Sequence, residues 1–167
     1  EGKDPAVHSS PITQMGKTFD DITGANAHKN QPAIEALAAR GVIDGKSDGS
    51  FDPEGSMTRA EFAAIVVRAL GLTPEGKNSF SDVAAEAWYA PYVGTAYSCG
   101  IITGVADGRF NPSGTITRQE AAVMVSRAAK LCGLETEMDN AAIRNMLAQF
   151  PDYMSTAEWA RAPLAFC

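Results

Sequence analysis

The chain has 167 residues, 45% of them hydrophobic and 20% charged, so it can bury a core of ordinary size and is not a disordered tail. Its formal net charge of −6, from 20 acidic and 14 basic residues without a Lys or Arg cluster, argues against a sequence-independent grip on nucleic acid or an anionic membrane. We also expect no membrane span, because no apolar run approaches the roughly 20 residues that one needs.

Residues 1–17 are rich in Ser, Pro and small polar residues, which is typical of a linker. The first predicted helix follows, since Pro32 suits an opening turn and Gly41 is placed to end it. The apolar face of this helix consists of Ile34, Leu37 and Ala38.

A glycine-rich loop comes next, with Asp48-Gly49 as a strong turn signal and Phe51 as a lone aromatic that we expect to plug the loop onto the helices. The loop ends at Thr58-Arg59-Ala60-Glu61. Thr58 and Glu61 form a capping box, in which each side chain satisfies a backbone N–H at the start of a second helix. Apolar residues at helical spacing continue to Leu70, so this helix must bury one face.

The same order returns later in the chain. Residues 41–72 align without gaps on residues 100–131, with 16 identities in 32 positions at a constant offset of 59. The second unit therefore repeats the helix, the glycine loop and the capping box, which is now Thr117 with Glu120. A third start appears at residues 150–153, and the chain ends before a third glycine loop.

A unit of about 55 residues could hardly bury its helix faces alone, so we expect the units to pack on each other. Asp139 can cap a short helix in a stretch that has no counterpart between the first two units. We divide the chain into a linker (1–17), a first motif (18–79), a second motif (80–133), a connector helix (134–149) and the start of a third motif (150–167).

Several segments of the second unit carry a resemblance: Phe80-x-Asp82-Val83, Trp88, Gly100 to Gly104, Asp107 to Pro112 and Ile116 to Glu120. They resemble the S-layer homology (SLH) motif. The first unit is similar to it in the loop and in the Thr-Arg-Ala-Glu segment, but it has His28 near the usual position of the tryptophan. The resemblance covers residues 18–133 and the beginning of a third motif.

This resemblance implies an all-α, pseudo-threefold module from a secreted protein of the cell wall or surface layer, with the third unit incomplete. Such modules anchor proteins to the bacterial wall by binding a secondary cell-wall polysaccharide, often one with pyruvylated N-acetylmannosamine. Their recognition is associated with the arginine of the Thr-Arg-Ala-Glu segment, in grooves between adjacent lobes. The implied contacts are Arg59 and Arg118, so at most two such sites are present.

The positions of these two arginines also favour the binding of an anion. Arg59 and Arg118 fall at first helical positions, where a guanidinium beside free N–H groups can receive a carboxylate such as that of a pyruvate ketal. The alternative is that each arginine pairs with a nearby acid, such as Asp48 or Asp107, and only fixes the loop. The other candidates for the polysaccharide site are Gly45, Gly104, Trp88, Asp82 and Asp21.

For the tryptophans and the aspartates, the sequence allows both a structural role and a ligand-binding role. Trp88 and Trp159 either stack on a sugar ring or anchor the core. Asp21, Asp82 and Asp152 recur after Phe, and they either cap the first helix of each unit or reach the ligand. We assign purely structural capping to Thr58, Glu61, Thr117 and Glu120.

We expect neither a metal nor a cofactor. Cys99, Cys132 and Cys167 are odd in number and lack metal-ligand spacing, and we expect the first two to be small buried residues. His8 and His28 are far apart in polar segments. The run from Asp44 to Gly49 faintly resembles a calcium loop but has Lys46 where an acidic ligand is needed.

The sequence therefore favours a non-catalytic module that binds wall polysaccharide. An enzyme is disfavoured, because no nucleophile–base or paired-carboxylate arrangement recurs with the repeats. The alternative is a protein–protein or self-assembly module of a surface-layer protein. An exposed apolar face from Trp159, Leu164 and Phe166 in the incomplete third motif would then seek a partner.

Overall fold

The computed structural model describes residues 7–77 and 80–167. The first six residues of the predicted linker and the last two of the predicted first motif lie outside these ranges. The α-helices of the described residues are α1 (Gln31–Ala38), α2 (Arg59–Ala69), α3 (Ala90–Ser98), α4 (Arg118–Leu131), α5 (Asn140–Leu147) and α6 (Glu158–Phe166). Short 3-10 turns are η1 (Asp20–Ile22), η2 (Gly24–Asn26), η3 (Ala106–Gly108) and η4 (Tyr153–Ser155). These ranges hold no sheet, only an isolated bridge between Thr58 and Thr115, which confirms the all-α class.

The predicted helix ends are present. Both capping boxes form, as in α2, where Thr58 N–H donates to Glu61 Oε2 at 2.7 Å and Glu61 N–H donates to Thr58 Oγ1 at 3.2 Å. Gly41 takes a φ of +65° after α1, a conformation that glycine adopts without strain. Asp139 caps α5 by accepting hydrogen bonds from Ala141 N and Ala142 N, each at 2.8 Å.

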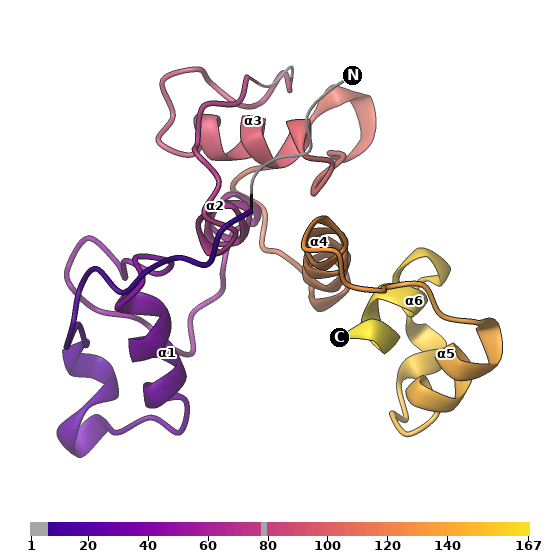
Figure 1. The fold of residues 1–167 in the computed structure, drawn as a ribbon, viewed down its shortest axis with the longest axis horizontal. Helices are drawn as coiled ribbons and strands as arrows, with labels where there is room; N and C mark the ends of the chain where they lie inside the picture. The colour runs from indigo at the N-terminus through magenta and orange to yellow at the C-terminus, as the bar shows by residue number, and fades with distance from the viewer. Residues whose placement is uncertain (1–6, 78–79) are drawn as a thin grey trace.

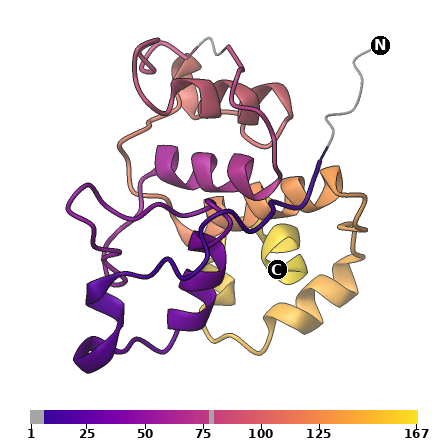
Figure 2. The ribbon, with the colours of Figure 1, turned by 60° about the vertical axis from the view of Figure 1, so that its left-hand side comes forward.

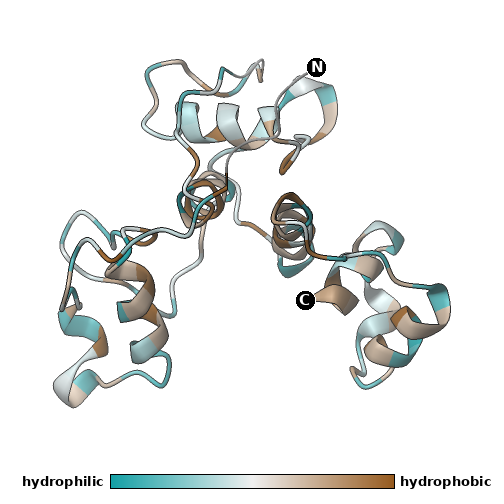
Figure 3. Ribbon diagram, viewed as in Figure 1, coloured by the Kyte–Doolittle hydropathy of each residue, from teal (hydrophilic) through white to brown (hydrophobic). Residues whose placement is uncertain are grey.

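The helices form three lobes around a centre (Figure 1). α2 and α4 lie at the centre and are seen end-on, while α1, α3 and the α5–α6 pair lie in separate outer lobes. Apolar positions concentrate on α2 and α4, and the outer loops are largely hydrophilic (Figure 3). The main core joins α2, α3, the second loop and α4, with Val67, Val93 and Phe110 fully buried.

Each central helix packs against the outer helix of the following unit. α2 lies against α3, and α4 lies against α6. The second loop also binds the start of α2, because Arg59 N–H donates to Gly114 O at 2.9 Å and Ala60 N–H donates to Pro112 O at 3.1 Å. The predicted packing between units is therefore confirmed, and the packing unit runs from one motif into the next.

Residues 7–17, which we expected to be a linker, run along the centre to the first lobe (Figure 2). His8 N–H donates to Leu70 O at 3.0 Å, and Thr13 N–H donates to Ala39 O at 2.8 Å. These bonds satisfy carbonyls at the ends of α2 and α1, which would otherwise lack a partner within their helices.

All three cysteines are free. Cys99 is half-buried, and its burial raises the pKa of its thiol. Cys132 is exposed, so the expectation that it is buried is wrong. It is the C-cap residue of α4, and the two residues that follow it are exposed as well.

Candidate functional site

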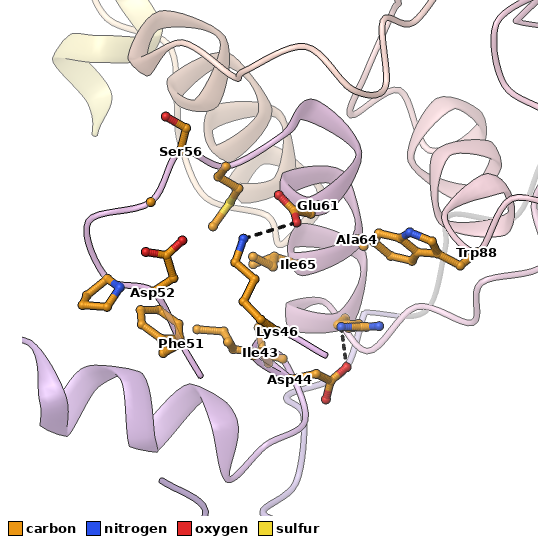
Figure 4. A pocket seen from close by; sticks show the side chains of 16 residues that line it. Ile43, Asp44, Lys46, Phe51, Asp52, Ser56, Glu61, Ala64, Ile65 and Trp88 are labelled. Atoms are coloured by element: carbon orange, nitrogen blue, oxygen red, sulfur yellow. Dashed lines mark ion pairs between the residues drawn. The ribbon is translucent and has the colours of Figure 1, made fainter. Parts of the chain in front are cut away.

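A hollow lies between the first glycine loop, α2 and the residue that leads into α3. Its volume is about 350 Å³, within the range of small-ligand sites. The first loop forms one wall, one face of α2 forms the floor, and Trp88 of the second unit stands at the edge (Figure 4). We call it the first groove; its lining is Val42, Ile43, Asp44, Gly45, Lys46, Phe51, Asp52, Pro53, Gly55, Ser56, Met57, Glu61, Ala64, Ile65, Arg68 and Trp88.

Two cations face this groove, and each has an acidic neighbour. Lys46 Nζ lies 3.8 Å from Glu61 Oε1, and an Arg68 terminal nitrogen lies 2.8 Å from Asp44 Oδ2 (Figure 4). The longer distance exceeds the range of a hydrogen bond, so the lysine keeps its three N–H donors for other partners. The apolar side chains of Ile43 and Ile65 lie between the two ion pairs.

Arg68 is held in place by a second residue. Its guanidinium carbon lies 4.8 Å from the centroid of the Tyr92 ring, and its Nε and a terminal nitrogen each donate to the Tyr92 hydroxyl at 3.3 Å. Together with Asp44, Tyr92 fixes the guanidinium between α2 and α3. A fixed guanidinium loses less entropy when it binds an anion than a mobile one does.

Both tryptophans are largely exposed, so neither anchors the core. Trp88 is 56% exposed and packs edge-on against Tyr92, with ring centroids 6.3 Å apart. Trp159 is 59% exposed at the start of α6. The orientation that remains for Trp88 is toward solvent at the edge of the first groove.

Arg59 lies inside the molecule and not in the first groove. It is 5% exposed, its Nε donates to Phe110 O at 2.9 Å, and its guanidinium carbon lies 5.0 Å from the Phe110 ring centroid. One terminal nitrogen forms an ion pair with Glu120. The acid that it pairs with is therefore in the second capping box, and neither Asp48 nor Asp107 is its partner.

Arg118, the counterpart of Arg59 in the repeat, is exposed at the start of α4. Across residues 7–77 and 80–167, no carboxylate pairs with its guanidinium. The acids proposed as its alternatives are occupied locally: Asp48 accepts from Ser50 N at 3.0 Å, and Asp107 lies 4.0 Å from Arg109.

Asp21 and Asp82 hold the two loops. Asp82 accepts hydrogen bonds from Phe110 N at 2.8 Å and Asn111 N at 2.7 Å, and Asp21 accepts from the corresponding Phe51 and Asp52. Burial would raise the pKa of Asp82, but the two backbone N–H groups outweigh it and the pKa is lowered. The bonds from Phe51 and Asp52 lower the pKa of Asp21. Neither aspartate caps a helix with its side chain.

Gly45 and Gly104 are required by the loop backbone. Each has a φ near +80°, at +82° and +79°. A Cβ on Gly104 would lie 2.6 Å from the Phe80 ring and 2.7 Å from Arg109 O. The glycines therefore let the first aromatic of each unit close on its loop, and Gly45 also lines the first groove.

Of the residues expected at the polysaccharide site, the first groove brings together Gly45 and Trp88, with Glu61 of the capping box. It does not include Arg59, Arg118 or Asp48. Lys46 and Arg68 were not among the expected contacts. The repeat held one signal for Arg68, because an arginine recurs 59 residues later, at position 127, on an otherwise apolar helix face.

The described helices include none that is long and apolar enough to cross a membrane. In the same residues, no group of three His, Cys, Asp or Glu side chains could hold a metal ion. The features present are those of a helical, repeat-built module with a charged groove edged by an aromatic ring.

The family model of the S-layer homology domain matches residues 18–63 and 79–122 of the sequence. The chain therefore belongs to this family. The family and the S-layer relatives indicate a secreted protein of the cell surface or surface layer. The chain is similar to proteins with quite different names. An amylopullulanase of Thermoanaerobacterium thermosulfurigenes is 36% identical over 164 residues, which is 96% of this chain and 8% of that protein.

An exoglucanase of Acetivibrio thermocellus is 34% identical over 158 residues, covering 93% of this chain and 14% of that protein. The surface-layer 125 kDa protein of Lysinibacillus sphaericus is 36% identical over 132 residues, covering 79% of this chain and 10% of that protein. The chain thus spans 8% to 14% of the length of these relatives. What it shares with them is a module of cell-surface anchoring.

Proposed function

We propose that this chain is a non-catalytic module that anchors its parent protein by binding an anionic wall polysaccharide in the first groove. The carrying observation is that Lys46 and Arg68 face one hollow whose edge is an exposed tryptophan. Charge-assisted hydrogen bonds from these two side chains suit a carboxylate, such as that of a pyruvylated amino sugar. The apolar face of the sugar ring stacks on Trp88.

This proposal assigns the contact with the anionic group to Lys46 and Arg68, and not to Arg59 as the sequence predicted. The first N–H groups of α2, which an anion would need, already donate to the second loop. Arg59 acts as a positioning residue, because it holds Phe110 and Glu120 of the second unit against α2. Of the three carboxylates that line the groove, Glu61 and Asp44 are paired with cations, and Asp52 forms no ion pair among the described residues. The two ion pairs are suited to binding charge and not to donating a proton.

The test is calorimetric titration with purified, pyruvylated wall polysaccharide. We expect Lys46→Gln, Arg68→Gln and Trp88→Ala each to weaken binding about tenfold or more, since a hydrogen bond to a charged group contributes about 1.5–3 kcal/mol. Mild acid removal of the ketal-linked pyruvate weakens binding by the parent chain in the same way. Lys29→Gln is the matched control, because Lys29 is an exposed cation of the same unit outside the groove.

Parent-like binding by both Lys46→Gln and Trp88→Ala would overturn this assignment. Arg118→Gln belongs in the same series, because Arg118 is exposed and was the contact expected at the second helix start. If it alone reduced the affinity, the charge contact would lie at the start of α4 and not in the first groove.

A further inference from the structure

The repeat gives the second unit a set of residues that correspond to those of the first groove. We call it the second groove: the loop residues 59 positions later, 101–116, with Arg127 on α4 in the place of Arg68 on α2. The two loops form the same backbone hydrogen bond at Lys46 and at the corresponding Val105. Lys46 N–H donates to Ser50 O at 2.7 Å, and Val105 N–H donates to Arg109 O at 2.7 Å.

Two charges of the first groove, those of Asp44 and Lys46, are missing from the second. Val105 stands where the first loop has Lys46, and it is 40% exposed, so its side chain points out of the fold as the lysine does. Thr103, also exposed, stands where the first loop has Asp44. One repeat thus supplies an ammonium and a carboxylate, and the other supplies an isopropyl group and a hydroxyl.

The arginine that both repeats share is held differently. In the first groove, Asp44 and Tyr92 orient Arg68 from two sides. In the second groove, Leu164 corresponds to Tyr92, because both residues follow an Ala-Pro pair. Leu164 has no hydroxyl that could accept a hydrogen bond from the arginine. Arg127 instead donates to the backbone carbonyl of Ile101 at 3.3 Å, and no carboxylate of the described residues pairs with it.

We propose that the chain binds one anionic sugar residue, in the first groove, and that the charged side chains at positions 44 and 46 set this selectivity. The inference rests on the function proposed above and adds its stoichiometry and its determinants. Lys46 supplies a charge that the second groove lacks, while Asp44 and Tyr92 keep the shared arginine turned toward the ligand. The second groove keeps the arginine of the site, as Arg127, but lacks the charges at the positions of Asp44 and Lys46.

The test is gain of a second site. Thr103 and Val105 are both exposed, so the double variant Thr103→Asp/Val105→Lys is compatible with the fold. Titration with a short pyruvylated oligosaccharide that carries one carboxylate should give one site in the parent and two in the double variant. Thr103→Asn/Val105→Gln, which matches the size without the charge, should keep one site.

A Lys46→Gln change in the parent should remove the measured site, whereas the same change in the double variant should leave one. Two sites in the parent overturn this inference and leave the proposed function standing. One site in the double variant also overturns it, because charge at 103 and 105 would then not set selectivity. No heat with the parent overturns the proposed function itself, so the two failures are distinguishable.

Discussion

Arg59 shows how a single buried charge joins two repeats. Its guanidinium reaches the carbonyl of Phe110, the face of that ring, and the carboxylate of Glu120, all in the second unit. A buried cation is tolerated only where such partners satisfy it. The Thr-Arg-x-Glu segment therefore serves two purposes, because its Thr and Glu start a helix while its Arg selects the neighbouring unit.

Asp82 makes a residue-scale prediction about pH. Asp82→Ala leaves two loop N–H groups without their acceptor, and we expect it to lower the free energy of unfolding at pH 7 by about 1.5 kcal/mol or more. The folded-state pKa of Asp82 is lowered, so its contribution is complete above the unfolded pKa of about 3.9 and is lost as pH falls through the folded pKa. The difference between parent and variant should therefore shrink at pH 3.

Urea denaturation at pH 7 and pH 3 measures this difference. Asp20→Ala is a suitable control, because Asp20 is exposed and its carboxylate binds no backbone N–H of the described residues. An equal loss of stability for Asp82→Ala at both pH values would show that the ionised carboxylate is not what holds the second loop.

At this scale the sequence predicts local bonds well and distant ones poorly. The two capping boxes follow from Thr and Glu three residues apart, because both partners belong to the same helix start. The partner of Arg59 lies 61 residues away. Nothing in the spacing distinguishes Glu120 from closer acids such as Asp48, since that choice depends on how the units dock.

The helices that pack together do not belong to the same sequence motif, because each central helix packs on the outer helix of the next motif. α2 is covered by α3 and α4 by α6, and the first groove combines the loop of one motif with Trp88 of the next. The positions of the helices could be predicted from periodicity and caps. Their partners could not, because an amphipathic stripe shows that a face is buried without showing against what. The start of the third motif serves to cover α4.

Gly94 lies inside α3, where glycine is ordinarily less favourable for helix stability than alanine by about 1 kcal/mol. A Cβ at this position would meet the backbone of Gly76 and lie 2.9 Å from Lys77 N. Gly94→Ala should therefore destabilise the chain by about 1–3 kcal/mol, as overpacking does. Urea denaturation tests the sign, with Asn145→Ala on the exposed side of α5 as a propensity control; stabilisation by both changes would contradict the close contact.

Over the whole molecule, the all-α class and the mutual packing of the units follow from sequence, since both depend on the repeat. The first groove could not be predicted from the sequence, because no motif links the loop position and the helix face that supply its two cations. Lys46 and Arg68 are 22 positions apart, and Trp88 belongs to the next unit. The docking of α3 on α2 brings Trp88 to the groove that Lys46 and Arg68 line.

The net charge of −6 makes a last prediction about salt. A polyanion is repelled by the overall field of the chain, so attraction must come from the two cations of the first groove, Lys46 and Arg68. Two released counterions give a slope of at most about two in log affinity against log salt, and screening of the overall repulsion reduces it further. Titrations between low and high salt should show this shallow dependence. A slope of about four or more would place the binding on a larger basic surface than the first groove provides.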